Sequence, residues 1–245
     1  MTLIFKEVKN KYYQAIIKED HLKIGLVAKK HNQINYHDPL DQIRFQEKAI
    51  LQSLLEIEKK DILFLDQVHQ DKIFFIERRF EEDFPVVGSG DGFFTPLEKV
   101  CLVIRTADCV PVFIFDKKKK ILGAVHSGWK GSWLEISAKL VRQLKKNYDS
   151  KSSDLKVFIL PGIGPQAYEV GQEVAENFSP DCLVKKADKF FLNLPKVICQ
   201  SLEKENISSE NILITKICSF TSKKDFFSHR QGDLGRNLNF AYLIF

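Results

Sequence analysis

The chain alternates short apolar runs with segments whose apolar residues recur at helical spacing. Residues 100–105 and 110–115 are apolar and rich in β-branched side chains, which is typical of strands buried on both faces. Asp116 and four lysines then form a predicted turn, and the chain returns as a strand over 121–125. Further strands are predicted over 22–28, 62–65, 72–76, 156–160, 211–215 and 239–244.

Helices are predicted between these strands. Asp38 and Pro39 indicate a helix start, with a capping side chain before a proline at the first helical position. This helix carries apolar residues on one face, namely Ile43, Ile50, Leu51, Leu54 and Leu55. A helix from about Ser132 does the same with Leu134, Ala138, Val141 and Leu144. A short helix near 172–177 and a longer one over 195–204 complete a pattern that predicts a single mixed α/β domain, 1–245.

Three glycine-containing segments are predicted to be loops. They cover 86–92, 127–131 and 161–165. The last contains two prolines and two glycines in five residues, which excludes regular structure. The segments 127–131 and 161–165 lie at the ends of predicted strands, where ligand-binding residues are often placed.

Composition narrows the function classes. A net charge of +5 over 245 residues is too small to favour nucleic acid, and the lysines at 117–120 are interpreted as a solvated hairpin tip. We find no apolar segment that suggests a signal peptide or a membrane span. The five cysteines are odd in number and scattered, so we expect reduced thiols and a cytoplasmic protein.

Candidate chemistry gathers at strand ends. His69, Cys109 and His126 are two imidazoles and a thiol, a set that binds catalytic zinc and leaves a fourth position for water or substrate. These soft ligands also suit copper(I). Taken singly, each residue has an ordinary structural interpretation: a cysteine between apolar strands packs as a small hydrophobic residue, and a histidine at a strand end forms hydrogen bonds. Spacing alone leaves both interpretations open.

Nearby segments offer sites for an anion. Gly128 and the three residues after it precede a predicted helix, whose first N–H groups can bind phosphate. Gly164 lies in a tight loop where backbone can approach a ligand closely. Arg230 and Arg236 offer cationic partners for phosphate. An ordinary crossover turn and a solvated basic loop explain these last two segments equally well.

Five ordered motifs together resemble the YfiH or laccase-domain family, also called the multicopper polyphenol oxidase or purine nucleoside phosphorylase family. The match runs from about residue 67 to residue 171, and three of the motifs are at least eight residues long. The motifs are Asp66-Gln67-Val68-His69, Asp91-Gly92, Arg105 to Val112, Ala124 to Gly131 and Gly162 to Gly171.

The resemblance implies an α/β sandwich of mixed sheets and one zinc ion bound by His69, Cys109 and His126. It also implies phosphorolysis of purine nucleosides, including adenosine, inosine and methylthioadenosine, together with deamination of adenosine. Older family names imply a copper polyphenol oxidase, and some bacterial members are credited with editing peptidoglycan precursors. Under the leading interpretation, the partners are purine nucleosides and phosphate, with no nucleic acid and no membrane.

Two departures from the family pattern concern the cationic surroundings of the site. The helix after Asp-Pro usually carries an Asn-Arg pair, but this chain has Gln46-Glu47-Lys48. Near the C-terminus Gln231 follows Arg230, where the family usually has a second arginine, and the segment is one residue short. We therefore expect weak use of phosphate, which a Gln231→Arg substitution would strengthen if the loop aims that side chain inward.

Other functions remain open from the sequence. Cys109 could be the nucleophile of a metal-free hydrolase with a histidine as its base. In a deaminase Asp108 could move a proton, although capping its own turn is at least as good a role. A multicopper oxidase is disfavoured because the chain has only six histidines. A nucleoside-binding protein without activity, the preferred purine and the oligomeric state are left undecided.

Overall fold

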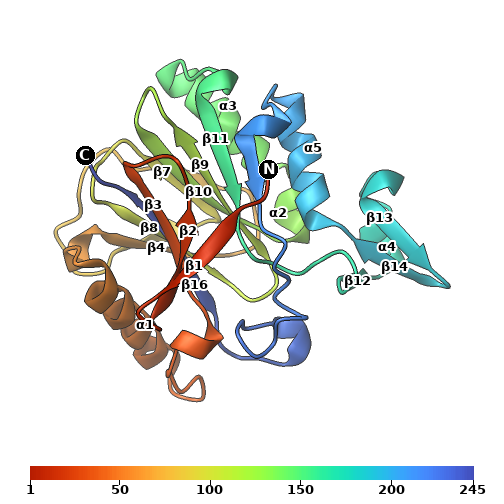
Figure 1. Cartoon of the computed structure of the whole chain (residues 1–245), viewed down its shortest axis with the longest axis horizontal. Coiled ribbons are helices and arrows are strands. Elements are labelled where there is room, and N and C mark those ends of the chain that lie inside the picture. The colour runs from red at the N-terminus through yellow and green to blue at the C-terminus, as the bar shows by residue number, and fades with distance from the viewer.

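The computed structural model describes residues 1–245 and contains two large β-sheets and one small sheet (Figure 1). The large sheets have seven strands in the order β1-β2-β3-β16-β8-β4-β6 and six in the order β15-β11-β9-β10-β7-β5. The seven strands are Ile4–Val8 (β1), Tyr12–Ile16 (β2), Leu22–Val27 (β3), Asn237–Leu243 (β16), Cys101–Thr106 (β8), Ile62–Asp66 (β4) and Val86–Ser89 (β6). The six are Ile212–Ile214 (β15), Leu155–Ile159 (β11), Val110–Asp116 (β9), Ile121–Ser127 (β10), Gly92–Thr95 (β7) and Ile73–Phe75 (β5).

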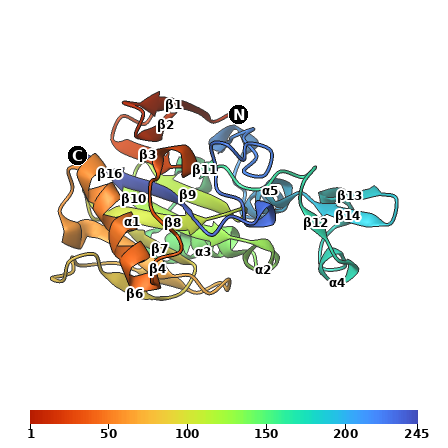
Figure 2. The same ribbon diagram turned by 90° about the horizontal axis from the view of Figure 1, so that it is seen from below.

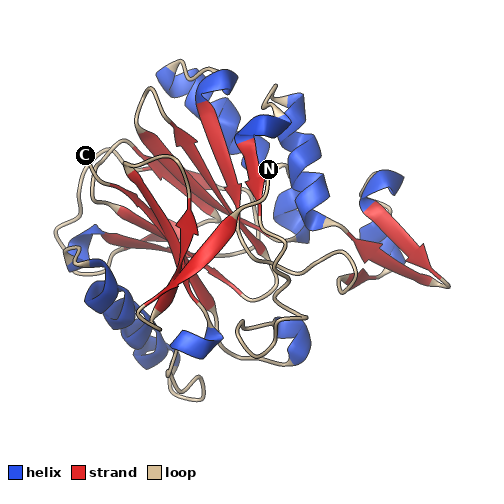
Figure 3. Ribbon diagram, viewed as in Figure 1, coloured by secondary structure: helices blue, strands red, loops and turns tan.

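Helices flank the paired large sheets (Figure 3). They are Leu40–Leu55 (α1), Trp129–Trp133 (α2), Ile136–Tyr148 (α3) and Leu194–Lys204 (α5). The small sheet, β12-β14-β13, extends from one side of the molecule together with α4 (Figure 2). Its elements span Glu169–Val170 (β12), Gln172–Ala175 (α4), Leu183–Lys186 (β13) and Lys189–Leu192 (β14). No helix is both long enough and apolar enough to cross a membrane.

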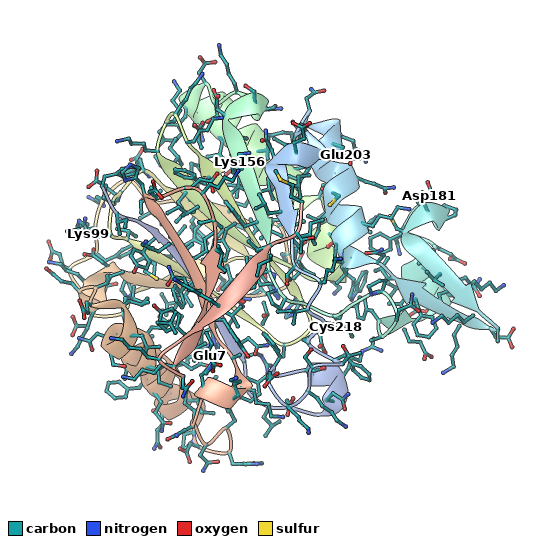
Figure 4. All side chains as sticks on the ribbon, viewed as in Figure 1. Glu7, Lys99, Lys156, Asp181, Glu203 and Cys218 are labelled. Atoms are coloured by element: carbon teal, nitrogen blue, oxygen red, sulfur yellow. The ribbon has the colours of Figure 1, made fainter.

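Alternation along the central strands explains the layers. On β8, Leu102 and Ile104 belong to the core between the two large sheets, whereas Cys101 and Val103 face the core beneath α1. On β9, Phe113 also faces the other sheet, and its neighbours pack against α3 and α5. Because successive strand residues point to opposite faces, each central strand is buried on both sides. Side chains fill the space between the sheets (Figure 4), and the predicted α/β sandwich is confirmed.

Several predicted boundaries were wrong. The segment 86–92 is largely strand, because β6 pairs in parallel with β4. The predicted loop at 127–131 contains the start of α2, and Glu135 in a left-handed conformation (φ 54°) separates α2 from α3. Asp38 does not cap α1; its carboxylate accepts from Asn35 and Gln46. Strands β1 and β2 and the hairpin β13–β14 were not predicted from the sequence.

Candidate metal centre

His69, Cys109 and His126 come together from three separate segments of the chain. His69 follows β4, Cys109 lies where the chain crosses from β8 to β9, and His126 is near the end of β10. Ligand atoms of the three residues all lie within 4.8 Å of one another. The imidazole rings meet edge to face with centroids 4.8 Å apart. This group can hold a metal ion, since two imidazoles and a thiolate are a known zinc-binding set.

Asp91, between β6 and β7, fixes the positions of both histidines. It is fully buried, and its Oδ1 accepts a hydrogen bond from Nδ1 of His126 at 2.8 Å. Since a carboxylate only accepts, Nδ1 carries the proton and Nε2 is free for a metal. The same carboxylate accepts the backbone N–H groups of Val68, His69 and Gln70 at 3.2, 3.0 and 2.7 Å. These bonds hold His69 in a left-handed conformation (φ 58°) that a non-glycine residue rarely adopts.

The thiol of Cys109 is in surroundings that favour its ionised form. Burial raises the pKa of Cys109, but the facing imidazoles of His126 and His69 outweigh this effect and lower the pKa to about 6. The thiolate is the form that binds metal. Gly128 leaves room for it, because a Cβ at that position would lie 2.8 Å from Sγ of Cys109.

A pocket of about 530 Å³ opens beside the three residues. Its lining includes the donor set, four arginines and two aromatic side chains, namely Arg44, Arg105, Arg230, Arg236, Trp129 and Tyr168. The guanidinium of Arg230 lies over the ring of Tyr168, 5.1 Å from its centroid. Arg236 donates only to the carbonyl groups of Leu234 and Gly235, so neither Arg230 nor Arg236 is neutralised by a carboxylate.

Asp108 anchors the loop that carries Arg230. Its Oδ2 accepts the backbone N–H of Arg230 at 2.8 Å, and its Oδ1 accepts the hydroxyl of Ser219 at 2.7 Å. The backbone carbonyl of Asp108 accepts the N–H of Ile163 at 2.8 Å. The carboxylate is therefore occupied by structural hydrogen bonds, which favours the anchoring role over proton transfer.

The two predicted glycine contacts with substrate have no support in the geometry. Gly164 is outside the pocket lining, and its N–H donates to Sγ of Cys218, which is labelled in Figure 4. Gly128 also lies outside the lining and caps α2, whose five residues are too few for an effective helix dipole. Its observed role is to leave space for Cys109.

Gln231 does not face the pocket either. Its side chain is exposed and donates to the carbonyl of Phe220 at 3.1 Å. Lys48, in the altered segment of α1, donates to the carbonyl of Phe84, away from the donor set. The two departures thus leave a pocket that still has four arginines, and the expectation of weak phosphate use loses its structural basis.

Sequence reasoning missed Asp91, Arg44 and Arg105. Asp91 was present in the Asp-Gly motif, but nothing in one sequence connects a carboxylate with a histidine 35 residues away. Arg44 on α1 and Arg105 at the end of β8 line the same pocket only because α1 packs on the sheet that contains β8. A charged residue at the end of an otherwise apolar strand was the available signal for Arg105.

Comparisons with known proteins identify relatives of this chain in sequence and in fold. Residues 27–244 match the family described as multi-copper polyphenol oxidoreductase laccase. A purine nucleoside phosphorylase of Clostridium acetobutylicum is 32% identical over 189 residues, which cover 76% of this chain and 77% of that protein. Purine nucleoside phosphorylase YlmD of Bacillus subtilis is 29% identical over 192 residues, 73% of this chain and 69% of that one.

The fold has a close counterpart among solved structures. The crystal structure of YlmD from Geobacillus stearothermophilus superimposes with a TM-score of 0.88 at 21% identity, covering 98% of this chain and 99% of that chain. The family match covers nearly all of the sequence, and the resemblance of the motifs is confirmed. The solved structures of YfiH and YlmD thus share the fold of this chain, and the family match shows that the chain belongs to the multi-copper polyphenol oxidoreductase laccase family.

Proposed function

We propose that this protein is a zinc-dependent purine nucleoside phosphorylase that acts on adenosine, inosine and methylthioadenosine and also deaminates adenosine. The observation that carries the proposal is the shared pocket, in which a possible metal site and four arginines face one space. Relatives named purine nucleoside phosphorylase support this choice of substrate.

The donor set fits zinc. His126 has its Nδ1 bonded to Asp91, the thiol of Cys109 has a lowered pKa, and Gly128 leaves the sulfur uncovered. Two imidazoles and one thiolate with an open fourth position match a catalytic zinc site, while a multicopper oxidase needs more histidine ligands than this set provides. When bound, zinc would supply a Lewis acid at the base of the pocket.

The chain's own residues would orient the reactants in phosphorolysis. A phosphate oxygen attacks C1′ of the ribose, the N-glycosidic bond breaks, and the purine leaves with its electron pair and takes up a proton. The products are the free base and ribose 1-phosphate. The uncompensated guanidinium groups of Arg230 and Arg236 would bind the phosphate, and Trp129 and Tyr168 offer aromatic surfaces to the purine. Holding both reactants in one pocket supplies much of the rate gain.

One experiment tests the reaction. The protein is incubated with adenosine, with and without phosphate, and the products are separated by chromatography. Phosphorolysis gives adenine and ribose 1-phosphate only when phosphate is present. Deamination gives inosine without phosphate, and with phosphate that inosine is cleaved in turn to hypoxanthine and ribose 1-phosphate. Intact adenosine in every sample would contradict the proposal.

A second candidate is a cysteine hydrolase, such as one that edits peptidoglycan precursors. It is favoured by one observation: Asp91 orients His126, which in turn faces Cys109 in the order of a catalytic triad. Chelation distinguishes the two candidates, because a cysteine hydrolase keeps its activity when the metal is removed.

A further inference from the structure

Glu47 is a buried carboxylate in α1, beside the wall of the pocket. Only 1% of its surface is exposed. Burying an ionised carboxylate is unfavourable unless it is paired, so its partner indicates its role. That partner is Arg105, whose Nε lies 2.7 Å from Oε2 and whose Nη2 donates to Oε1 at 3.2 Å. One hydrogen bond and one close ion-pair contact thus hold the guanidinium against the carboxylate, and Nε and Oε2 form no hydrogen bond with each other.

The backbone of Arg105 is fixed as well. Its N–H donates to Oε1 of Gln67 at 2.8 Å, and its carbonyl accepts Nε2 of Gln67 at 2.9 Å. Gln67 lies two residues before His69, so this pair of bonds connects Arg105 to the donor set. Nη1 of Arg105 forms no hydrogen bond within the protein, although the residue lines the pocket and its side chain is 19% exposed.

The surrounding charges also indicate an anion. Burial and the nearby guanidinium of Arg105 both lower the pKa of Arg236, so the two arginines repel each other at this wall. Tyr36 links Glu47 to Arg236, because its hydroxyl lies 3.4 Å from Oε1 of Glu47 and 3.5 Å from the carbonyl oxygen of Arg236. One buried carboxylate thus lies near two partly exposed cations, and this leaves a net positive charge for a ligand to neutralise.

We propose that Arg105 is a further anion-binding residue of the pocket and that Glu47 is its positioning residue. The ion pair with Glu47 engages Nε and Nη2, which leaves Nη1 for an oxygen of a tetrahedral oxyanion. The identity of that anion as the phosphate co-substrate rests on the proposed function. Arg105 at the end of β8 thereby supplies a fixed guanidinium to the pocket, and the carboxylate of Glu47 on α1 holds that guanidinium in place.

The test measures binding of inorganic phosphate, and of sulfate, to the full-length protein by the rise in its melting temperature with anion concentration. Arg105→Lys keeps the charge opposite Glu47 but loses the planar guanidinium and its Nη1 donor, and should weaken phosphate binding about tenfold or more. Glu47→Gln should also weaken binding, although it makes the pocket more positive. Arg142→Lys is the matched control: Arg142 lies exposed on α3, where it pairs with Glu205, and the variant should bind as the wild type does.

Kinetics supply a second readout. In Arg105→Lys and Glu47→Gln the KM for phosphate should rise while the KM for nucleoside stays unchanged, a split that general loss of structure would not produce. Tighter phosphate binding by Glu47→Gln would show that Glu47 only neutralises Arg105, and wild-type binding by Arg105→Lys would overturn the inference. Failure of the wild type to bind either anion would overturn it too. Phosphate binding without phosphorolysis would leave the inference standing and contradict only the proposed function.

Discussion

Replacing Gly128 with alanine tests whether the space beside Cys109 exists for a metal ligand. A Cβ at position 128 would lie 2.8 Å from Sγ of Cys109 and 3.7 Å from Cδ2 of His69. Non-bonded heavy atoms prefer separations of about 3.5–4.0 Å, so the sulfur would have to move by roughly 0.7–1.2 Å. Metal–ligand distances hold to within about 0.2 Å, and a displacement of this size should therefore impair the site.

We expect Gly128→Ala to weaken zinc binding by at least the roughly 10–100-fold that follows loss of a residue supporting a ligand. The metal-free variant should unfold close to the wild type, because the backbone at Gly128 (φ −79°, ψ −174°) suits any residue. Gly123→Ala is the matched control: its Cβ would meet Cδ2 of Leu140 at 2.7 Å, and its three nearest atoms all belong to Leu140 and not to a proposed metal ligand. It should lower stability and leave zinc affinity unchanged.

Competition with a coloured chelator measures zinc affinity in both variants, and urea unfolding measures stability. Wild-type zinc affinity in Gly128→Ala would refute the reasoning, since the sulfur would then have tolerated the new methyl group without moving from a ligand position. A large loss of stability in the metal-free variant would instead show that the glycine serves packing.

Three further substitutions test other parts of the account. Asp91→Asn should lower zinc affinity about 10–100-fold, because an amide cannot accept from His126 and from three backbone N–H groups as a carboxylate does; chelator competition checks this, and unchanged affinity would contradict it. Gln231→Arg should leave the KM for phosphate unchanged, because position 231 is exposed and faces Phe220; a lower KM would show that the loop turns inward. Burial raises the pKa of Glu205, but hydrogen bonds from Lys145 and Arg142 outweigh this effect and lower the pKa below 4.5. The stabilising contribution of Glu205 is therefore present above pH 4.5 and is lost as the pH falls further. Glu205→Gln should therefore reduce the dependence of unfolding free energy on pH below about 4.5, and an unchanged slope in urea titrations would count against this.

Much of the sandwich could be predicted because its central strands are continuous apolar runs. Val110 to Phe115 is buried on both faces, and this leaves a clear signal in the sequence. The edge strands β1 and β2 carry mixed polar residues with exposed faces, so their pairing depends on neighbours that a local pattern does not contain. The strand β6 was mistaken for a loop because its glycine permits both conformations, and its pairing with β4 decided the outcome.

The donor set could be predicted from residue chemistry and the motifs, but its surroundings could not. The sequence predicted that three side chains come together at one site, because all of them lie at strand ends; they are His69, Cys109 and His126. Asp91 and Arg105 act through partners that are distant in sequence, Asp91 with His126 and Arg105 with Glu47. Such pairs depend on how α1 and the two sheets pack, which periodicity does not specify.

The most direct test of the central claim is turnover of adenosine with phosphate by metal-stripped protein as zinc is added back. If His69, Cys109 and His126 form the zinc site of a phosphorylase, the stripped protein should be inactive, and production of adenine should rise in proportion to added zinc until about one equivalent per chain. Full activity in the stripped protein, unchanged by zinc, would contradict the account and favour Cys109 as the nucleophile of a metal-free enzyme.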